Sequence, residues 1–410
     1  MRQAAGPLRL PVATTLSPVA GDAAGERRSR VLHVITALGV GGAEHMLLKL
    51  LAARALGDFE QRVVALLPDG ALAARMRATG AAVDELDLLG GVPVIGGTLA
   101  LARLARAFAP HVVHGWMYHG NLGASVARRA AGRRVPLIWG IRQSLASLDG
   151  ENAYAKAAIR LGRLLSRDPD RILFNSRTSL QQHRDDGFHP RRMEYLPNGF
   201  DTERFAPDAA ARARVRSEWG AADADTVFGM VARYHPAKNH AGFLRAAGAV
   251  AAARPGARFV LAGPGVDADH PELAGLAARL GIAERVRLLG AREDVPSIMA
   301  GLDVYVSAST AIEAFSNAIG EALCAGVPCI ATAVGDSPTV IGRDGLIVQA
   351  GDVDALAGAM VELVDAGPQR RCEIGQRGRE RMQAEYGLEA VAGRYAALYR
   401  ELIDARQAWG

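Results

Sequence analysis

The chain has 410 residues, of which 50% are hydrophobic and 22% are charged, and this composition excludes a wholly disordered protein. This length exceeds one ordinary hydrophobic core, so we expect two domains. The formal net charge of +5 permits anionic ligands or a membrane surface and requires neither. Three cysteines indicate neither a disulfide framework nor a zinc cluster, which fits a reducing cytoplasm.

Residues 1–28 mix Pro, Gly, Ala and Arg without a continuous apolar core. We interpret them as a disordered tail, with a weak targeting segment as the alternative. No uninterrupted apolar run approaches the roughly 18 to 20 residues that a membrane-spanning helix needs. We therefore expect a cytoplasmic protein.

After this tail, short β-rich runs alternate with longer Ala/Leu/Arg segments of helical period. Two successive sets of this kind predict an α/β protein with two doubly wound, Rossmann-like domains, whose ligand site lies in the cleft between them. The stretch PNGFDTERFAP at 197–207 has no regular period and is the best linker candidate. The expected strands lie at 30–38, 61–68, 82–88, 111–116, 136–141 and 171–176, and then at 226–233, 257–263, 285–290, 303–308, 329–334 and 345–349.

A glycine-rich loop, ALGVGGAEHMLLKL at 37–50, follows the first expected strand. Gly39, Gly41 and Gly42 let a ligand approach the backbone before a helix opens. The loop superficially resembles the G-x-G-x-x-G dinucleotide fingerprint, but Glu44 stands at the sixth position, and the acid expected at the end of the second strand is missing, since Asp69 comes thirty positions after Gly39. These departures disfavour a nicotinamide dehydrogenase, and a purely structural turn remains the alternative.

Two cations lie in VARYHPAKNH at 231–240, directly after the first strand of the second set. Arg233 and Lys238 occupy a loop broken by Pro236, where they are well placed to meet phosphates. A helix N-terminus offers about half a charge, whereas a departing nucleoside diphosphate gains close to a full one. Two cations can therefore take the place of a divalent metal, and we interpret the four D-x-D triplets of the chain as caps and turns.

Two glutamates, Glu313 and Glu321, lie eight positions apart in the segment 312–332, IEAFSNAIGEALCAGVPCIAT. On one helix they would point about 80° apart, which argues against an acid/base pair on one face. Ser316 or Asn317 is a good N-cap, so we expect a helix that contains only Glu321. The free N–H groups at its start suit a phosphate, and the flanking carboxylates suit the hydroxyls of a sugar nucleotide. Two solvated glutamates around an ordinary core helix are the alternative.

The segment ENAYAKAAIRLGRLLSRDPD at 151–170 predicts a basic amphipathic helix. Such a helix is suited to rest on an anionic inner leaflet and to present a lipid-linked acceptor, while an ordinary helix with a solvated basic face is the alternative. The basic face consists of Lys156, Arg160, Arg163 and Arg167, and the opposite apolar face of Tyr154, Ala158, Leu161 and Leu165.

Taken in order, GVGGAE, PNGFD, VARYHPAKNH, the E-x7-E element with AFSNA inside it, and CAGVPCIAT resemble the family 4 retaining glycosyltransferases (group 1) over roughly residues 30 to 410. The resemblance implies the GT-B fold, with an acceptor-side domain at 29–200, a nucleotide-sugar domain at 207–387 and a last helix, about 388–410, that packs back on the first. It implies a hexosyltransferase-type enzyme that needs no metal and no cofactor beyond a UDP- or GDP-sugar. Its products would be surface polysaccharide, lipopolysaccharide or glycolipid.

By this resemblance, Arg233 and Lys238 hold the diphosphate, Glu313 acts on the transferred sugar, and Glu321 binds the ribose hydroxyls. The FSNA backbone binds the β-phosphate, and the glycine loop closes on the donor. The leaving phosphate can take the proton of the acceptor, so a side-chain base need not exist. The donor-binding residues implied besides Glu321 are Gly41, Gly42, Phe315, Ser316, Asn317 and Ala318.

The sequence departs from the family after the fifth strand, where many relatives carry a histidine. Here the stretch reads IWGIRQS, with Arg142 nearest. His119, His114 and Arg142 are candidates to touch the sugar or the acceptor, with His119 also a candidate catalytic residue. The alternative is that both histidines are buried structural residues.

Two other functions are compatible with the same fold. A sugar-nucleotide epimerase would bind the donor without an acceptor, and the ordered family 4 elements disfavour it. A non-catalytic sugar-nucleotide-binding protein would not need so complete a leaving-group apparatus. We expect no nucleic-acid partner, and we expect a cytoplasmic protein that can associate peripherally with the inner face of the plasma membrane.

Overall fold

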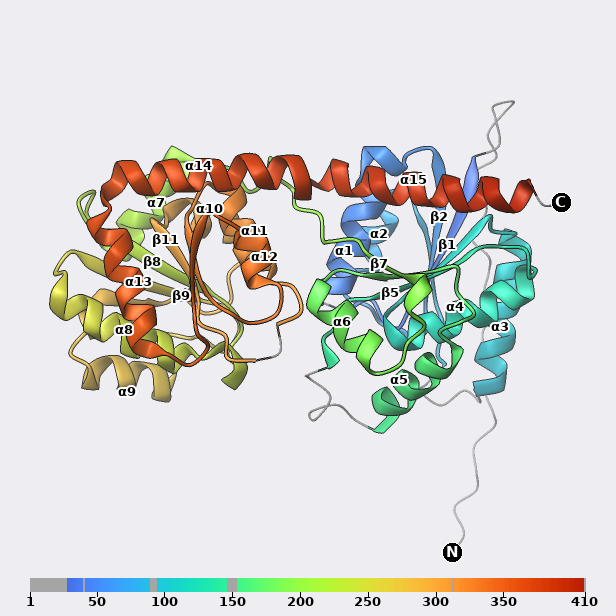
Figure 1. Ribbon diagram of the computed structural model, residues 1–410, viewed down its shortest axis with the longest axis horizontal. Coiled ribbons are helices and arrows are strands. Elements are labelled where there is room, and N and C mark those ends of the chain that lie inside the picture. The colour runs from blue at the N-terminus through green and yellow to red at the C-terminus, as the bar shows by residue number, and fades with distance from the viewer. Residues whose placement is uncertain (1–27, 40, 89–93, 146–152, 312, 409–410) are drawn as a thin grey trace, which may run out of the picture.

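The computed structural model describes residues 28–39, 41–88, 94–145, 153–311 and 313–408. These residues form two α/β lobes (Figure 1). The tail expected at 1–28 lies outside the described residues except for Arg28. Each expected strand is present, so the predicted fold class is confirmed.

The first lobe contains a seven-stranded parallel sheet in the order β3-β2-β1-β4-β5-β6-β7. Its last strand, β7, is a short edge strand that the sequence did not predict. The strands are β1 (Ser29–Ile35), β2 (Phe59–Ala65), β3 (Ala82–Glu85), β4 (Val112–Trp116), β5 (Leu137–Ile141), β6 (Arg171–Phe174) and β7 (Met193–Tyr195). The α-helices before the linker are α1 (Gly42–Ala52), α2 (Ala73–Arg77), α3 (Val94–Phe108), α4 (Met117–Ala131), α5 (Ala153–Leu165) and α6 (Arg177–Asp185).

Alternation along β1 builds two apolar layers, one on each face of the sheet. On one face, Val31 and Ile35 pack with α1, α2 and the last helix of the chain. On the other, Leu32 and Val34 pack with α3 and α4. Because both faces are covered, ligands can approach this sheet only at the ends of its strands.

The second lobe contains a six-stranded parallel sheet in the order β10-β9-β8-β11-β12-β13. Its strands are β8 (Thr226–Val231), β9 (Ala257–Ala262), β10 (Val286–Leu288), β11 (Val304–Ser307), β12 (Cys329–Thr332) and β13 (Gly345–Val348). Its helices are α7 (Ala209–Trp219), α8 (His240–Ala253), α9 (Pro271–Arg279), α10 (Val295–Gly301), α11 (Asn317–Cys324), α12 (Ser337–Ile341) and α13 (Val353–Asp365).

Two long helices, α14 (Gly367–Tyr386) and α15 (Leu388–Gln407), run end to end along both lobes (Figure 1). Val391, Tyr395 and Tyr399 of α15 join the core of the first lobe. At the helix junction, Phe200 N donates to Tyr386 O over 2.8 Å, and Leu388 N donates to Phe200 O over 2.8 Å. The two crossings of the chain between the lobes are therefore bonded to each other.

Candidate active site

The order of strands reverses once in each sheet, between β1 and β4 and between β8 and β11. Loops that leave such a switch point diverge and open a crevice at the carboxyl ends of the strands. The glycine loop and the start of α4 leave the first switch point. The Arg233 loop and the segment that carries Glu313 leave the second.

The second switch point gathers three of the predicted site residues. Lys238 Nζ forms an ion pair with Glu313, and Ser309 Oγ donates to the same carboxylate over 3.1 Å. Thr310 N donates to Ala237 O over 2.9 Å and so ties the two loops together. Arg233 is exposed and has no ion-pair partner among the described residues. The site thus holds one neutralised cation and one uncompensated cation.

A glycine that the sequence analysis did not single out packs closely against the backbone of the loop that carries Arg233. Gly263 follows β9 with a φ of +146°, and a Cβ placed on it would lie 2.2 Å from Ala232 O. No other residue allows this approach without strain. The backbone that carries Arg233 is therefore fixed by the neighbouring loop, although its side chain reaches solvent.

Helix α11 begins as predicted, with Ser316 as N-cap and Glu313 outside the helix. Phe315 is buried and stacks on Phe200 of the linker, with ring centroids 6.0 Å apart. The first N–H groups of α11 have no partner within the helix and are available to an anion. The partly buried Ala318 is the second residue of this helix.

The glycine loop of the first lobe lies opposite this helix start. A Cβ placed on Gly42 would lie 3.6 Å from Asn317 Nδ2. Gly41 is the N-cap of α1, and its carbonyl accepts from His45 N over 3.1 Å. The structure therefore brings together the two loops that the sequence placed in different domains.

Glu321 lies inside α11, as predicted, but it is directed toward the linker side of the cleft. Burial raises its pKa to about 7, and the positive charges of Lys49 and Arg204 oppose this shift. Lys49 Nζ donates to Gly199 O over 3.3 Å, and burial lowers the pKa of its ammonium. Glu321 and Lys49 therefore link α11 electrostatically to α1 of the other lobe.

The histidines at the first switch point occupy different environments. His119 is partly buried in the first turn of α4, at the carboxyl end of β4. His114 is 0% exposed inside β4, where burial holds its pKa well below the usual range and its Nδ1 shares a 2.8 Å hydrogen bond with the Tyr399 hydroxyl. The expectation that His114 touches the sugar or the acceptor is thus corrected to a structural role in the core.

Arg142 is partly buried and bonds to other residues of the protein. Its guanidinium lies over the Trp116 ring, 4.9 Å from the centroid, and donates to Asn198 and, over 2.6 Å, to the Tyr395 hydroxyl. Both terminal nitrogens are thereby engaged by the protein itself. Each of these nitrogens keeps a second N–H group, so the direct contact of Arg142 with sugar or acceptor stays a prediction.

The sequence analysis missed an interlobe contact made by a buried carboxylate. Asp336, which is 1% exposed, precedes α12 in the second lobe. It accepts from Ser176 Oγ over 2.9 Å, from Arg177 N over 2.7 Å and from Thr178 N over 2.9 Å, at the start of α6 in the first lobe. An isolated aspartate before Ser-Pro gives no sequence signal that distinguishes this role from a local cap.

Helix α5 differs from the predicted two-faced pattern. Its buried residues are Ala158, Ile159 and Gly162. Tyr154 and Leu161, assigned to the apolar face, are 80% and 45% exposed. The assigned apolar face is therefore only partly buried, because Ala158 packs on the lobe together with Ile159 and Gly162, which were not assigned to that face.

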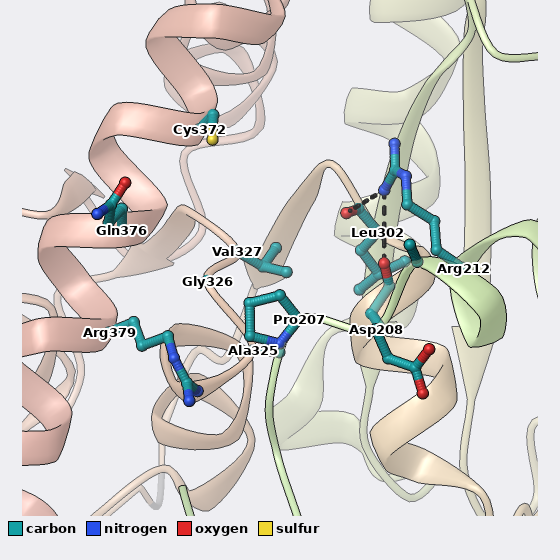
Figure 2. A pocket seen from close by; sticks show the side chains of 12 residues that line it. Pro207, Asp208, Arg212, Leu302, Ala325, Gly326, Val327, Cys372, Gln376 and Arg379 are labelled. Carbon is teal, nitrogen blue, oxygen red and sulfur yellow. Dashed lines mark hydrogen bonds between the residues drawn. The ribbon is translucent and has the colours of Figure 1, made fainter. Parts of the chain in front are cut away.

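A pocket of about 500 Å³ lies in the second lobe beside the linker (Figure 2). None of its lining residues is a predicted site residue. Two arginines that line it are engaged by backbone carbonyls: Arg212 donates to Leu302 O over 3.0 Å, and Arg379 donates to Phe205 O over 2.9 Å. The pocket is therefore separate from the cleft described above.

No group of three or more His, Cys, Asp or Glu side chains arranged to hold a metal occurs among the described residues. Asp170, Asp225 and Asp352, each from a D-x-D triplet, accept hydrogen bonds from the backbone N–H groups of Leu137, Ala222 and Ala355. The contacts of Asp225 and Asp352 confirm their interpretation as a turn residue and a helix cap, whereas Asp170 instead bonds to the start of β5, 33 positions away.

Two family models match the chain in succession. Glycosyltransferase Family 4 matches residues 40–204, and Glycosyl transferases group 1 matches residues 225–366. Together with two facing Rossmann-like lobes, these matches define a GT-B glycosyltransferase. The chain belongs to the family 4, or group 1, glycosyltransferases, and the epimerase and binding-protein alternatives are not favoured.

Several characterised proteins are similar to this chain. A GDP-mannose-dependent alpha-(1-6)-phosphatidylinositol monomannoside mannosyltransferase of Mycolicibacterium smegmatis is 29% identical over 299 residues, which cover 69% of this chain and 74% of the relative. A UDP-Gal:alpha-D-GlcNAc-diphosphoundecaprenol alpha-1,3-galactosyltransferase of Escherichia coli is 30% identical over 180 residues, which cover 43% of this chain and 46% of the relative.

Solved structures share the fold. Anabaena HepE in complex with UDP superposes with a TM-score of 0.80 and 20% identity, covering 91% of this chain and 100% of that chain. A glycosyltransferase from Rickettsia africae superposes with a TM-score of 0.78 and 14% identity, covering 92% of this chain and 99% of that chain. At these identities, the likeness establishes the two-lobed architecture alone.

Proposed function

We propose that the protein is a retaining, metal-independent glycosyltransferase that moves a hexosyl group from a UDP- or GDP-sugar to a glycan or lipid-linked acceptor. Its products would belong to cell-surface polysaccharide, lipopolysaccharide or glycolipid synthesis. The observation that carries this proposal is the cluster of Lys238, Glu313 and the free Arg233 at one switch point, opposite the glycine loop of the other. The similarity to GDP-mannose- and UDP-galactose-dependent transferases supports this donor class.

The leaving diphosphate binds between the two cations and the start of α11. In the ligand-free protein, Lys238 is neutralised by Glu313. An arriving phosphate competes for this ammonium, whereas no acidic residue in the described part of the chain pairs with Arg233. In a partly shielded cleft with an effective dielectric constant near 20, each cation can contribute a few kcal/mol to stabilising the leaving group. This supports catalysis without a divalent metal.

The two glutamates bind opposite ends of the donor. Glu313 lies next to the phosphate-binding cations, so it is placed to accept hydroxyls of the sugar attached to the terminal phosphate. Glu321 lies one helical turn into α11 and is assigned to the ribose hydroxyls. The backbone of Phe315–Ala318 binds the terminal phosphate, and Gly41 and Gly42 cover the sugar from the first lobe.

The reaction retains the configuration of the sugar. The bond between the anomeric carbon and the phosphate oxygen breaks, and the acceptor oxygen bonds to the same carbon from the same face. The acceptor proton passes to the leaving phosphate, which gains negative charge as it departs. His119, at the end of β4, is the candidate to orient the acceptor or the sugar from the first lobe.

The acceptor side includes a surface on α5 that suits an anionic membrane. At about 100° per residue, the buried sector of α5 is flanked on one side by basic residues and on the other by exposed apolar residues. Such a surface binds lipid by combining charge attraction with shallow apolar insertion. The basic residues of α5 are Lys156, Arg160 and Arg163, with Arg167 two residues beyond its end, and the apolar residues are Tyr154, Leu161 and Leu164, which is 73% exposed.

Membrane contact of this kind would be peripheral. Within the ranges that the structure describes, no helix has the length and apolar character required to cross a bilayer. We place the enzyme in the cytoplasm, on the inner face of the plasma membrane, where a lipid-linked acceptor presents its sugar. Nothing in this arrangement calls for a nucleic-acid partner.

The test is a thermal-shift panel of UDP-, GDP-, ADP- and TDP-sugars, followed by turnover measurements with the selected donor in excess chelator. A ligand stabilises the native state in proportion to its affinity, so one base should raise Tm above the others. Turnover should persist in chelator. Loss of turnover that a divalent cation restores would contradict the two-cation mechanism, and no shift with any donor would contradict the donor class.

A further inference from the structure

The side chain of Arg142 anchors a series of hydrogen bonds that ends at the start of α11. Its guanidinium donates to the Tyr395 hydroxyl of α15 over 2.6 Å and to Asn198 Oδ1, and it stacks on Trp116. A guanidinium only donates hydrogen bonds and cannot accept one. The atom of Asn198 that accepts a hydrogen bond from Arg142 must therefore be the amide oxygen.

This requirement fixes the orientation of Asn198. Its Oδ1 also accepts from Asn175 Nδ2 over 3.4 Å, so two donors face the same atom. The NH2 group of Asn198 must then point the other way, where it donates to Asn317 Oδ1 over 2.8 Å. Asn198 is 5% exposed, so water has little opportunity to compete for either group.

The orientation of the Asn198 amide in turn fixes the orientation of the Asn317 amide. Since its oxygen is occupied by Asn198, its NH2 group points away from the linker. A Cβ on Gly42 would lie 3.6 Å from this nitrogen, so the NH2 group borders the glycine loop at the first residue of α11. A donor-only guanidinium thus sets the direction of two amides in series.

We propose that Arg142 is a positioning residue that acts through Asn198 to direct the Asn317 NH2 group at the terminal phosphate of a nucleoside diphosphate. This inference rests on the proposed function, because it needs a diphosphate at the start of α11. With the opposite orientation, Asn317 would present its carbonyl oxygen to the phosphate and repel it. The bond from Tyr395 explains how α15, which crosses back to the first lobe, holds the far end of the series.

The variant Asn198→Asp tests this orientation with almost no change in size. The introduced carboxylate still accepts from Arg142, but it also presents an acceptor to Asn317, which must then turn its NH2 group toward residue 198 and its oxygen toward the ligand. The Kd of the nucleoside diphosphate, UDP or GDP, should rise about 10- to 100-fold, as expected for a lost hydrogen bond to a charged group. The Kd of the corresponding monophosphate, which lacks the terminal phosphate, should stay unchanged.

The negative charge that this variant adds at position 198 could itself repel an anion, so the same substitution is also made in an Asn317→Ala background. If the amide orientation is the cause, Asn198→Asp weakens diphosphate binding in the natural background and has little further effect in Asn317→Ala. Equal weakening in both backgrounds would overturn the inference, as would unchanged diphosphate binding in Asn198→Asp.

A second pair of variants tests the anchor itself. Arg142→Lys keeps a donor-only group facing Asn198, whereas Arg142→Met leaves only the longer bond from Asn175 to hold the orientation of that amide. Diphosphate binding should weaken more in Arg142→Met, with monophosphate binding unchanged in both variants. Equal losses for the two nucleotides would indicate a structural role and overturn the inference. If the unmodified protein binds no nucleoside diphosphate, the proposed function fails as well, whereas a failure confined to these variants removes only the role of Arg142.

Discussion

The two lobes present polar side chains differently at the carboxyl ends of their strands. In the second lobe, Lys238 and Glu313 bond to each other within the crevice, next to the exposed Arg233. In the first lobe, His114 and Arg142 turn into the interior and bond to tyrosines of α15. The crevice side of the first lobe is instead built from glycine backbone and the start of α4.

This difference indicates that the two lobes have different roles. In the proposed function, binding a pyrophosphate requires fixed charges, which the second lobe would supply from loops braced by Gly263 and Thr310. Closing over the donor requires a surface that admits another backbone, which glycine supplies. Buried polar residues of the first lobe such as His114 then hold the lobe and α15 together, so their substitution should affect stability before chemistry.

The largest effect is expected in the second lobe. Arg233→Ala or Lys238→Met should each lower kcat by about 100-fold or more, because each removes a preorganised charge at the leaving group. The measurement is steady-state turnover with the donor chosen by thermal shift. Arg279→Ala, at an exposed arginine of α9 in the same lobe, is the matched control. Full activity of either site variant would contradict the assignment of the phosphate site.

The next largest effect is expected for Glu321→Gln, in the pH dependence of the free energy of unfolding. The pKa of Glu321 is about 7 in the folded protein and near the ordinary value of 4.5 in the unfolded chain, so between these values the folded state binds more protons and stability falls as pH rises. Above pH 7, the penalty reaches up to about 3 kcal/mol. Glu321→Gln should therefore be more stable than the natural protein at pH 8 and similar to it at pH 4 in urea unfolding. A pH-independent difference would count against the raised pKa of Glu321.

A substitution of His114 tests whether this polar residue of the first lobe is structural. His114→Leu should lower the free energy of unfolding by about 1–3 kcal/mol, because the buried Tyr399 hydroxyl loses its partner. The kcat of the folded variant should remain that of the natural protein. Combining it with Tyr399→Phe removes the unpaired hydroxyl and should recover part of the loss. A fall in kcat without a fall in stability would indicate that His114 contacts the sugar or the acceptor.

The smallest effect is expected on α5. Leu164→Ser should weaken binding to anionic vesicles roughly tenfold, since it removes one partly inserted apolar side chain. Flotation with vesicles that contain an anionic phospholipid measures the bound fraction. Ile347→Ser, at an exposed apolar residue of β13 in the second lobe, is the control and should bind as the natural protein does. Equal behaviour of the two variants would exclude α5 as the membrane surface.

The sequence predicted the fold well because parallel strands buried on both faces give continuous apolar runs. The edge strand β7, at Met193–Tyr195, is too short and too exposed to give such a run. The start of α11 was predictable because Ser316 is a typical N-cap, and the position of Glu313 outside the helix follows from it.

The direction of polar side chains was less predictable. Nothing in IWGIRQS shows that Arg142 turns toward Tyr395, since this residue lies 253 positions further along the chain. The PNG stretch was recognised as a linker, but its asparagine, Asn198, gave no sign of bonding to Asn317 across the lobes. On α5, a helical repeat identifies opposite faces but does not decide which face the rest of the lobe covers.

The most direct measurement is a crystal structure of the protein with a bound nucleoside diphosphate. We expect the terminal phosphate to lie between Arg233, Lys238 and the backbone N–H groups at the start of α11, with Lys238 shared between Glu313 and the phosphate. A diphosphate bound elsewhere, with Lys238 and Glu313 still paired only to each other, would contradict the account.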